Sequence, residues 1–91
     1  MKFYNACIQV AEAVETMLNK EEQALFMETE DTQMYLYHFS LGIWIRDHYL
    51  KPDDYLYQAF CCLGLRDRDR MSSYLLLFIK SHWLLKRADM L

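Results

Sequence analysis

With 91 residues, the chain has the length of one domain and is too short for two. Hydrophobic residues make up 54% of it and aromatic residues 15%, which argues against an intrinsically disordered chain. The net charge of −3 argues against a general nucleic-acid binder, because such proteins carry an excess of Lys and Arg. We therefore predict one globular domain over residues 1–91.

The charge is divided unevenly along the chain. Residues 1–40 hold two Lys and seven Asp or Glu, for a net −5, whereas residues 41–91 hold eight Lys or Arg and six acids, for a net +2. An acidic first half beside a basic second half suits electrostatic steering toward a charged partner. The alternative is that these charges only solvate ordinary helix faces.

The cysteines and the N-terminus indicate where the protein is located. The three cysteines, Cys7, Cys61 and Cys62, do not form a disulfide framework, which favours a reducing cytoplasm. The N-terminal "MKFYNACIQVAEAVE" is too polar for a signal peptide. The most apolar stretch, "YLLLFIKSHWLL", is interrupted by Lys80 and His82, so we expect no membrane span.

The first two predicted elements are helices. Over about residues 2–19, apolar side chains from Phe3 to Leu18 recur at spacings of three and four, which is typical of an amphipathic helix. The segment "KEEQALFMETE" predicts a short second helix, with Glu21 and Glu22 in the first turn, where the helix dipole favours acids.

Three more helices are expected toward the C-terminus. Thr29, Asp31 and Thr32 are cap candidates for a third helix that continues to about His48 or Tyr49. In "LKPDDYLYQAFCCLG", a fourth helix has Pro52 in its first turn and stops at Gly64. Asp67 or Asp69 begins a fifth, which ends near Arg87. With two glycines and one proline in the chain, the predicted fold class is all-α, a compact bundle of about five helices.

The fifth helix is apolar around nearly its whole circumference, more than a surface helix needs. Either it passes through the middle of the bundle, or another chain covers one flank. We expect self-association, as in a homodimer, or an obligate partner.

Gly42 and Arg46 stand out in the third helix, "HFSLGIWIRDHYL". A glycine inside a helix costs roughly 1 kcal/mol relative to alanine, so we expect it to allow the close approach of large side chains such as Trp44 and Phe60. Arg46 lies one turn later on the same face, and we predict that it clamps Asp67 or Asp69 at the start of the fifth helix. The alternative for Arg46 is an anion receptor.

The same segment, with "GLRDRDRMSSYLLLFIKSHWL", resembles a family of small, uncharacterised bacterial and phage-borne helical domains. Its features are a Leu-Gly-aromatic-Ile-Arg segment and an Asp-Met-Ser helix start. The matching positions are Phe39, Leu41, Gly42, Trp44, Ile45, Arg46, Asp69, Met71 and Ser72. The resemblance implies a helical fold and a setting in mobile elements or bacterial defence, without implying an activity.

Catalysis is not expected. The three histidines and three cysteines show none of the HxxxH, CxxC or ExxH spacings used by metal sites, and the chain has no glycine-rich phosphate loop. We therefore predict that the protein is not an enzyme and that it has no catalytic residues, no metal and no cofactor.

Two binding hypotheses compete with a third, weaker one. The leading hypothesis is a non-enzymatic modulator that blocks the surface of a larger bacterial complex, such as an anti-CRISPR-like phage inhibitor. The alternative is an anion- or nucleotide-binding regulator that uses Arg66, Arg68 and Arg70 at a helix start. A DNA-binding regulator is the third and weakest hypothesis. The net negative charge of the chain disfavours direct binding to nucleic acid.

The predicted partner-binding residues are acids of the first half and aromatic side chains of the types enriched at binding hot spots. They are Glu12, Glu15, Glu21, Glu22, Tyr35, Tyr37, Tyr55, Tyr57 and Trp83.

Overall fold

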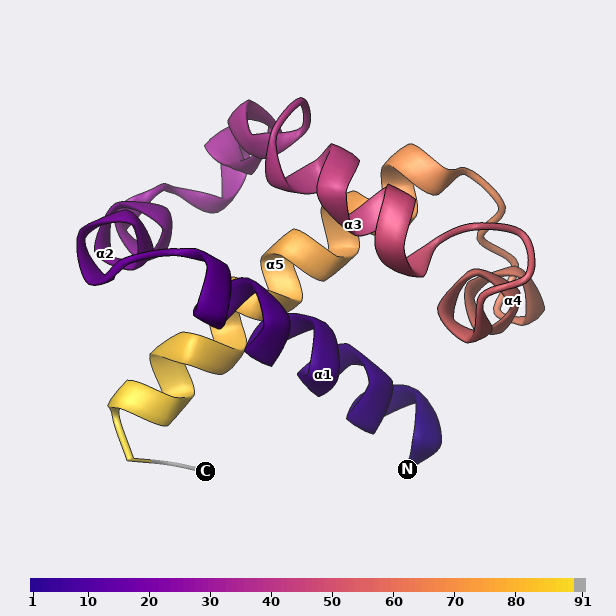
Figure 1. Ribbon diagram of the computed structural model, residues 1–91, viewed down its shortest axis with the longest axis horizontal. Coiled ribbons are helices and arrows are strands. Elements are labelled where there is room, and N and C mark those ends of the chain that lie inside the picture. Colours follow the sequence, from indigo (N-terminus) through magenta and orange to yellow (C-terminus); the bar gives the residue numbers. More distant parts are fainter. Residues whose placement is uncertain (90–91) are drawn as a thin grey trace.

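The computed structural model describes residues 1–89, and over these residues the fold is all-α. The helices are α1 (Lys2–Met17), α2 (Lys20–Glu28), the 3-10 helix η1 (Asp31–Tyr37), α3 (Leu41–Tyr49), α4 (Tyr55–Cys62) and α5 (Arg68–Arg87). α1 and α5 pass each other at the centre, and α2 and α4 lie at opposite ends (Figure 1). The number of α-helices agrees with the sequence prediction.

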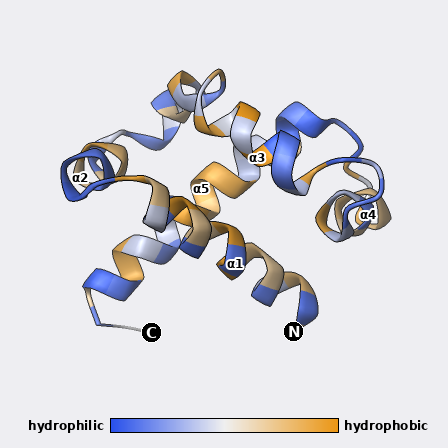
Figure 2. Ribbon diagram, in the orientation of Figure 1, coloured by the Kyte–Doolittle hydropathy of each residue, from blue (hydrophilic) through white to orange (hydrophobic). Residues whose placement is uncertain are grey.

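The core forms where α1 and α5 cross, and the apolar residues of both helices gather there (Figure 2). On α1 the buried residues are Cys7, Val10, Ala11 and Val14, at the helical spacing expected of one face. On α5 they are Met71, Ser72, Leu75, Leu76, Ile79 and Trp83. α5 contacts each of the other five elements, so its apolar middle is covered by its own chain. The exposed side chains Leu84 and Leu85 remain at its C-terminal end.

Local capping chemistry explains where several of the helices begin and end. Asn19 and Glu22 form a reciprocal capping box at the start of α2. Asp67 caps α5 by accepting a hydrogen bond from the Asp69 amide at 2.9 Å. Gly64 has a φ of +94°, the left-handed conformation predicted for the stop after α4.

The predicted start of the fourth helix was wrong by several residues. Pro52 and Asp53 lie in a turn before α4, whose N-cap is Asp54. The Asp54 carboxylate accepts a hydrogen bond from the Lys51 amide at 2.9 Å, which closes that turn and does not cap the helix.

The prediction of one continuous third helix was also wrong. The segment forms η1, a turn at His38–Ser40, and then α3, because Ser40 leaves the helical conformation with φ −122° and ψ −94°. Ser40 donates to the Tyr37 carbonyl, and Arg46 donates to the His38 carbonyl. At His38 a side chain, that of Arg46, therefore binds a carbonyl that a continuous helix would pair with a backbone amide.

Burial of Cys7 leads to a testable difference between the thiols. Burial in the core raises the pKa of the Cys7 thiol from 9.0 to about 11, whereas Cys62 is exposed. In thiol labelling of the native protein at pH 8, we expect Cys62 to react and Cys7 to react only after unfolding. Ionisation of Cys7 leaves stability unchanged below pH 9 and lowers it as the pH rises from 9 toward 11, because the unfolded chain releases the proton first. Equal labelling rates would contradict this placement of Cys7.

Candidate functional site

The guanidinium of Arg46 is the centre of a polar cluster, and only 9% of this residue is exposed. Its Nη1 donates to Ser72 Oγ on α5 at 2.8 Å, and its Nη2 donates to the His38 carbonyl at 3.1 Å. Its Nε lies 3.6 Å from the Asp69 carboxylate. We call His38, Arg46, Asp69 and Ser72 the Arg46 cluster. It ties the turn before α3 to the start of α5.

The geometry of the cluster also orients the His38 ring. A guanidinium can only donate, so His38 Nδ1, which lies 3.4 Å from Arg46 Nη1, is the acceptor. The proton of the neutral ring is then on Nε2, 3.9 Å from the Asp69 carboxylate. Phe39 packs edge-on against this ring, with 4.6 Å between ring centroids. The cluster therefore anchors His38, the residue next to Phe39, and the His38 ring contacts the Phe39 ring.

Gly42 lies close to the Arg46 cluster. A Cβ at this position would lie 3.1 Å from Arg46 Nη1 and 3.3 Å from the Tyr37 carbonyl oxygen. The expected approach of Trp44 and Phe60 was wrong, since the nearest atoms belong to Arg46, Tyr37 and Ser72. The missing Cβ makes room for a guanidinium and for a carbonyl of the turn.

We expect Gly42→Ala to lower the free energy of unfolding by about 1 kcal/mol, because overpacking against Arg46 outweighs the gain in helix propensity. In an Arg46→Ala background the same substitution should cost less, since the nearest atom is gone. Urea unfolding of the two single variants and the double variant gives this coupling. If the effects of the two single substitutions on the free energy of unfolding add strictly, the Gly42–Arg46 contact does not affect stability.

The structure separates the two acids that were predicted to pair with Arg46. Asp69 lies against Arg46, but the Asp67 carboxylate binds the Asp69 amide as the α5 cap. Asp69 is largely exposed, so its attraction to Arg46 is screened by water. The neutral acceptors of the cluster, the His38 carbonyl and Ser72 Oγ, therefore hold the guanidinium in place.

The arginine strip at the start of α5 does not form one anion site. Arg68 Nε donates to the Leu50 carbonyl at 2.8 Å, and its Nη2 donates to the Arg46 carbonyl at 3.1 Å. Arg68 thus satisfies carbonyls at the C-terminal end of α3. Within residues 1–89, Arg66 and Arg70 are exposed and have no ion pair.

The predicted aromatic contact residues differ in accessibility. Tyr35 and Tyr55 are exposed, and Tyr37 and Tyr57 are half-buried. Trp83 was wrongly placed at the surface: only 3% of it is exposed, and its ring packs against Phe26 in the core. Its indole N–H has no hydrogen-bond partner among the described residues. Trp83 stabilises the core and is not available to a partner.

The predicted acidic contact residues also have local roles. Glu22 belongs to the α2 capping box, and Glu15 pairs with Lys86 at 3.3 Å. Glu12 and Glu21 are exposed and lie outside the ion pairs of the described chain. The acids therefore lie on α1 and α2, and two of the four predicted acids already bind groups of the same chain.

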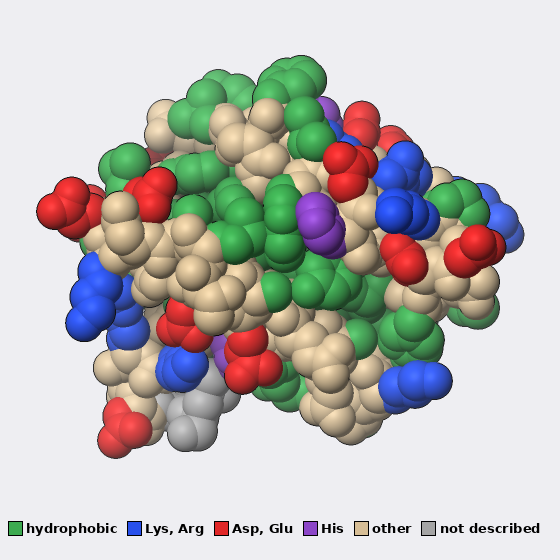
Figure 3. Space-filling model, viewed as in Figure 1, with side chains coloured by type: hydrophobic (Ala, Val, Ile, Leu, Met, Phe, Trp, Pro, Cys, Tyr) green, Lys and Arg blue, Asp and Glu red, His purple; other side chains and the backbone are tan. Residues whose placement is uncertain are grey.

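Residues 35–43 carry an apolar surface, of which only Tyr35 was among the predicted contact residues. Tyr35 is 68% exposed, Leu36 61% and Phe39 82%, and Ile43 follows on α3 with 42% exposed. Hydrophobic side chains gather over η1 at the top of the molecule (Figure 3). We call these four residues the η1 patch. In a continuous helix these four residues would lie on the face opposite Met34, Leu41 and Ile45, which are buried, so the predicted helix would also expose them.

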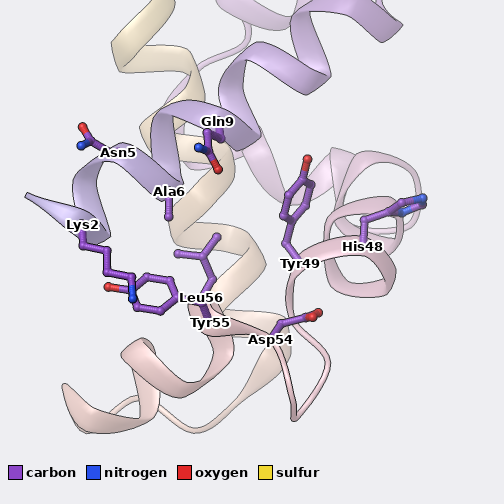
Figure 4. Close-up of a pocket in the computed structure, with 9 residues that line it drawn as sticks. All are labelled: Lys2, Asn5, Ala6, Gln9, His48, Tyr49, Asp54, Tyr55 and Leu56. Atoms are coloured by element: carbon purple, nitrogen blue, oxygen red, sulfur yellow. The ribbon is translucent and has the colours of Figure 1, made fainter.

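A second feature is a hollow of about 370 Å³ between α1, the end of α3 and the start of α4. Polar groups line it, but His48 points away from the others (Figure 4). His48 stacks on Trp44, and its Nδ1 lies 2.8 Å from the Trp44 carbonyl, while Lys2 lies over the Tyr55 ring. These groups do not converge on one point, as a catalytic set must.

Two negative observations apply to the described part of the chain, residues 1–89. No helix there is long and apolar enough to cross a membrane. No three His, Cys, Asp or Glu side chains come together as metal ligands there.

Fold and site together define a small all-helical domain in which a buried arginine, Arg46, holds the turn that leads to an exposed apolar surface. Residues 6–85 match the family model of a domain of unknown function, DUF6794, and the chain belongs to that family. No curated protein matches the chain, and no solved structure matches it.

Proposed function

We propose that the protein acts by stoichiometric binding of a protein partner through the η1 patch. The observation that carries this proposal is the exposure of Tyr35, Leu36 and Phe39, three large side chains within five residues. Apolar side chains grouped in this way on a small domain mark interaction sites, and aromatic residues dominate binding energy at such sites.

The anchoring of the patch supports the same conclusion. The Arg46 cluster holds the His38 carbonyl and ring, and the His38 ring supports Phe39. A contact residue that is already fixed loses little conformational entropy on binding. The buried arginine therefore serves binding indirectly, by preorganising the patch.

The charges near the patch indicate the chemistry of the partner. Residues 12–31 contain seven acids and one lysine, a net −6, and the chain enters η1 directly from this segment. Leu25 and Glu22 of α2 line a shallow hollow of about 250 Å³ that also includes Tyr37 and Ser40. The partner surface that fits is apolar at its centre and carries Lys or Arg at its edge.

The finer form of this proposal is a phage-borne inhibitor in the bacterial cytoplasm that blocks a surface of a larger defence complex, as an anti-CRISPR protein does. Its support is the sequence resemblance together with the small size and the acidic first half. The alternative, an anion-binding regulator, is supported only by Arg66 and Arg70, because Arg68 binds backbone carbonyls.

Site-specific photo-crosslinking in a lysate of the source cells tests the proposal. A crosslinking residue at position 39 should capture one protein, whereas the same residue at exposed Gln9 on α1 should not. Leu36→Asp should abolish the capture from position 39. Equal capture from both positions, or capture that survives Leu36→Asp, would show that the η1 patch is not the binding face.

A further inference from the structure

The start of η1 is not stabilised by local capping. No side chain caps its first turn, and the two residues before it, Thr29 and Glu30, have extended backbones with ψ of 130° and 149°. A 3-10 helix has poor hydrogen-bond geometry and is uncommon beyond about four residues, yet η1 runs over Asp31–Tyr37. The position of η1 therefore depends on contacts with other parts of the fold.

Lys80 of α5 supplies such a contact. Its Nζ donates to the Thr29 carbonyl and to the Asp31 carboxylate, the latter at 2.9 Å, and only 13% of the Lys80 side chain is exposed. The Asp31 side chain is 73% exposed, so water screens its attraction to the ammonium. The Thr29 carbonyl belongs to the backbone, so this hydrogen bond fixes the point at which the chain enters η1.

Arg46 has the same role at the other end of η1. It donates to the His38 carbonyl, and His38 directly follows η1. Between the two cations, η1 packs on the core through buried Met34 and through Tyr37, whose ring lies edge-on against Phe26. The segment that carries the first part of the η1 patch is therefore held at both ends, by side chains of α5 and α3.

We propose that Lys80 is a positioning residue for the η1 patch. It holds the start of η1 and so fixes Tyr35 and Leu36 for a partner that Lys80 itself does not touch. This inference rests on the proposed function. A contact segment that is free at one end loses more conformational entropy on binding than a segment held at both ends. Loss of Lys80 therefore weakens binding while every contact residue of the patch stays in place.

Backbone amide order parameters from NMR relaxation of the full chain give the first test, because they report motion within the native state. Lys80→Met keeps an apolar stem and removes the ammonium. Lys86→Met is the matched control, because Lys86 lies on the same helix and pairs with Glu15 at 3.3 Å. In Lys80→Met the order parameters of residues 31–37 should fall from about 0.85 toward about 0.6, with those of α1 unchanged. In Lys86→Met, residues 31–37 should keep their wild-type values.

Photo-crosslinking from position 36 in a lysate of the source cells gives the second test. The chain concentration needed for half-maximal capture should rise about three- to tenfold in Lys80→Met and stay unchanged in Lys86→Met. Lys80→Arg keeps the charge and the donors, so it should restore both the capture and the order parameters. Wild-type order parameters at residues 31–37 in Lys80→Met would overturn the inference, and so would capture equal to that of Lys86→Met.

The two tests separate this inference from the proposed function. Absence of specific capture from the wild type would overturn both. Capture that is specific in the wild type and equally strong in Lys80→Met would overturn the role of Lys80 alone. Lys80→Gln, which is shorter and uncharged, takes the place of Lys80→Met if circular dichroism shows that Lys80→Met is unfolded.

Discussion

Replacing Arg46 with alanine is expected to lower the free energy of unfolding by about 2–4 kcal/mol, the largest stability effect of any single polar side chain in the protein. The substitution leaves Ser72 Oγ and the His38 carbonyl without their donor and opens space beneath the turn. For a domain of this size, that loss lowers the melting temperature by roughly 10–25 °C. Urea unfolding followed by circular dichroism measures both values.

Two further variants separate hydrogen bonding from charge. Arg46→Lys keeps the charge but has one nitrogen to reach acceptors that lie in different directions, so it should restore less than half of the lost stability. Asp69→Asn should cost less than about 1 kcal/mol, because the carboxylate is largely exposed. If Arg46→Ala lowers the free energy of unfolding by less than about 0.5 kcal/mol, the Arg46 cluster does not stabilise the fold.

Phe39→Asp is expected to weaken partner binding at least thirtyfold while changing stability by no more than about 0.5 kcal/mol. The side chain is 82% exposed, so the folded protein loses little when it is replaced, whereas a bound partner would bury the new charge. Quantified crosslinking yield from position 36, in the presence and absence of the substitution, measures the effect.

Leu84→Asp is the matched control for Phe39→Asp. Leu84 is an exposed apolar residue at the C-terminal end of α5, away from η1 in the chain. The same change of side chain there should leave the crosslinking yield unaltered. Equal losses from both substitutions would indicate a general effect of added charge and would remove Phe39 as a contact residue.

The sequence predicts the parts of this fold that local chemistry decides. The 3.6-residue period of apolar side chains predicts α1, and the acids of the first turn predict α2. Asp67 marks the start of α5, and Gly64 marks the stop after α4. Burial and dipole preferences act within a few residues, so they can be recognised without the tertiary structure.

The break at His38–Ser40 could not be predicted in this way, because a contact between distant residues produces it. The cluster joins Arg46 to Ser72, twenty-six residues away, and no local pattern shows that an arginine will replace an amide as donor to the His38 carbonyl. The burial of Trp83 is a similar case, since its pairing with Phe26 joins α5 to α2.

The most direct test of the whole account is native-state hydrogen exchange of the amides of residues 38–44 in the wild type and in Arg46→Ala. The Ser40 and Trp44 amides donate to the Tyr37 and Ser40 carbonyls, so exchange reports how firmly the turn is held. We predict that these two amides lose protection in Arg46→Ala, by as much as Val10 and Val14, which lie in the core and exchange through global unfolding. Unchanged protection of the Ser40 and Trp44 amides, with protection lost at Val10 and Val14, would contradict the claim that Arg46 fixes the turn before α3.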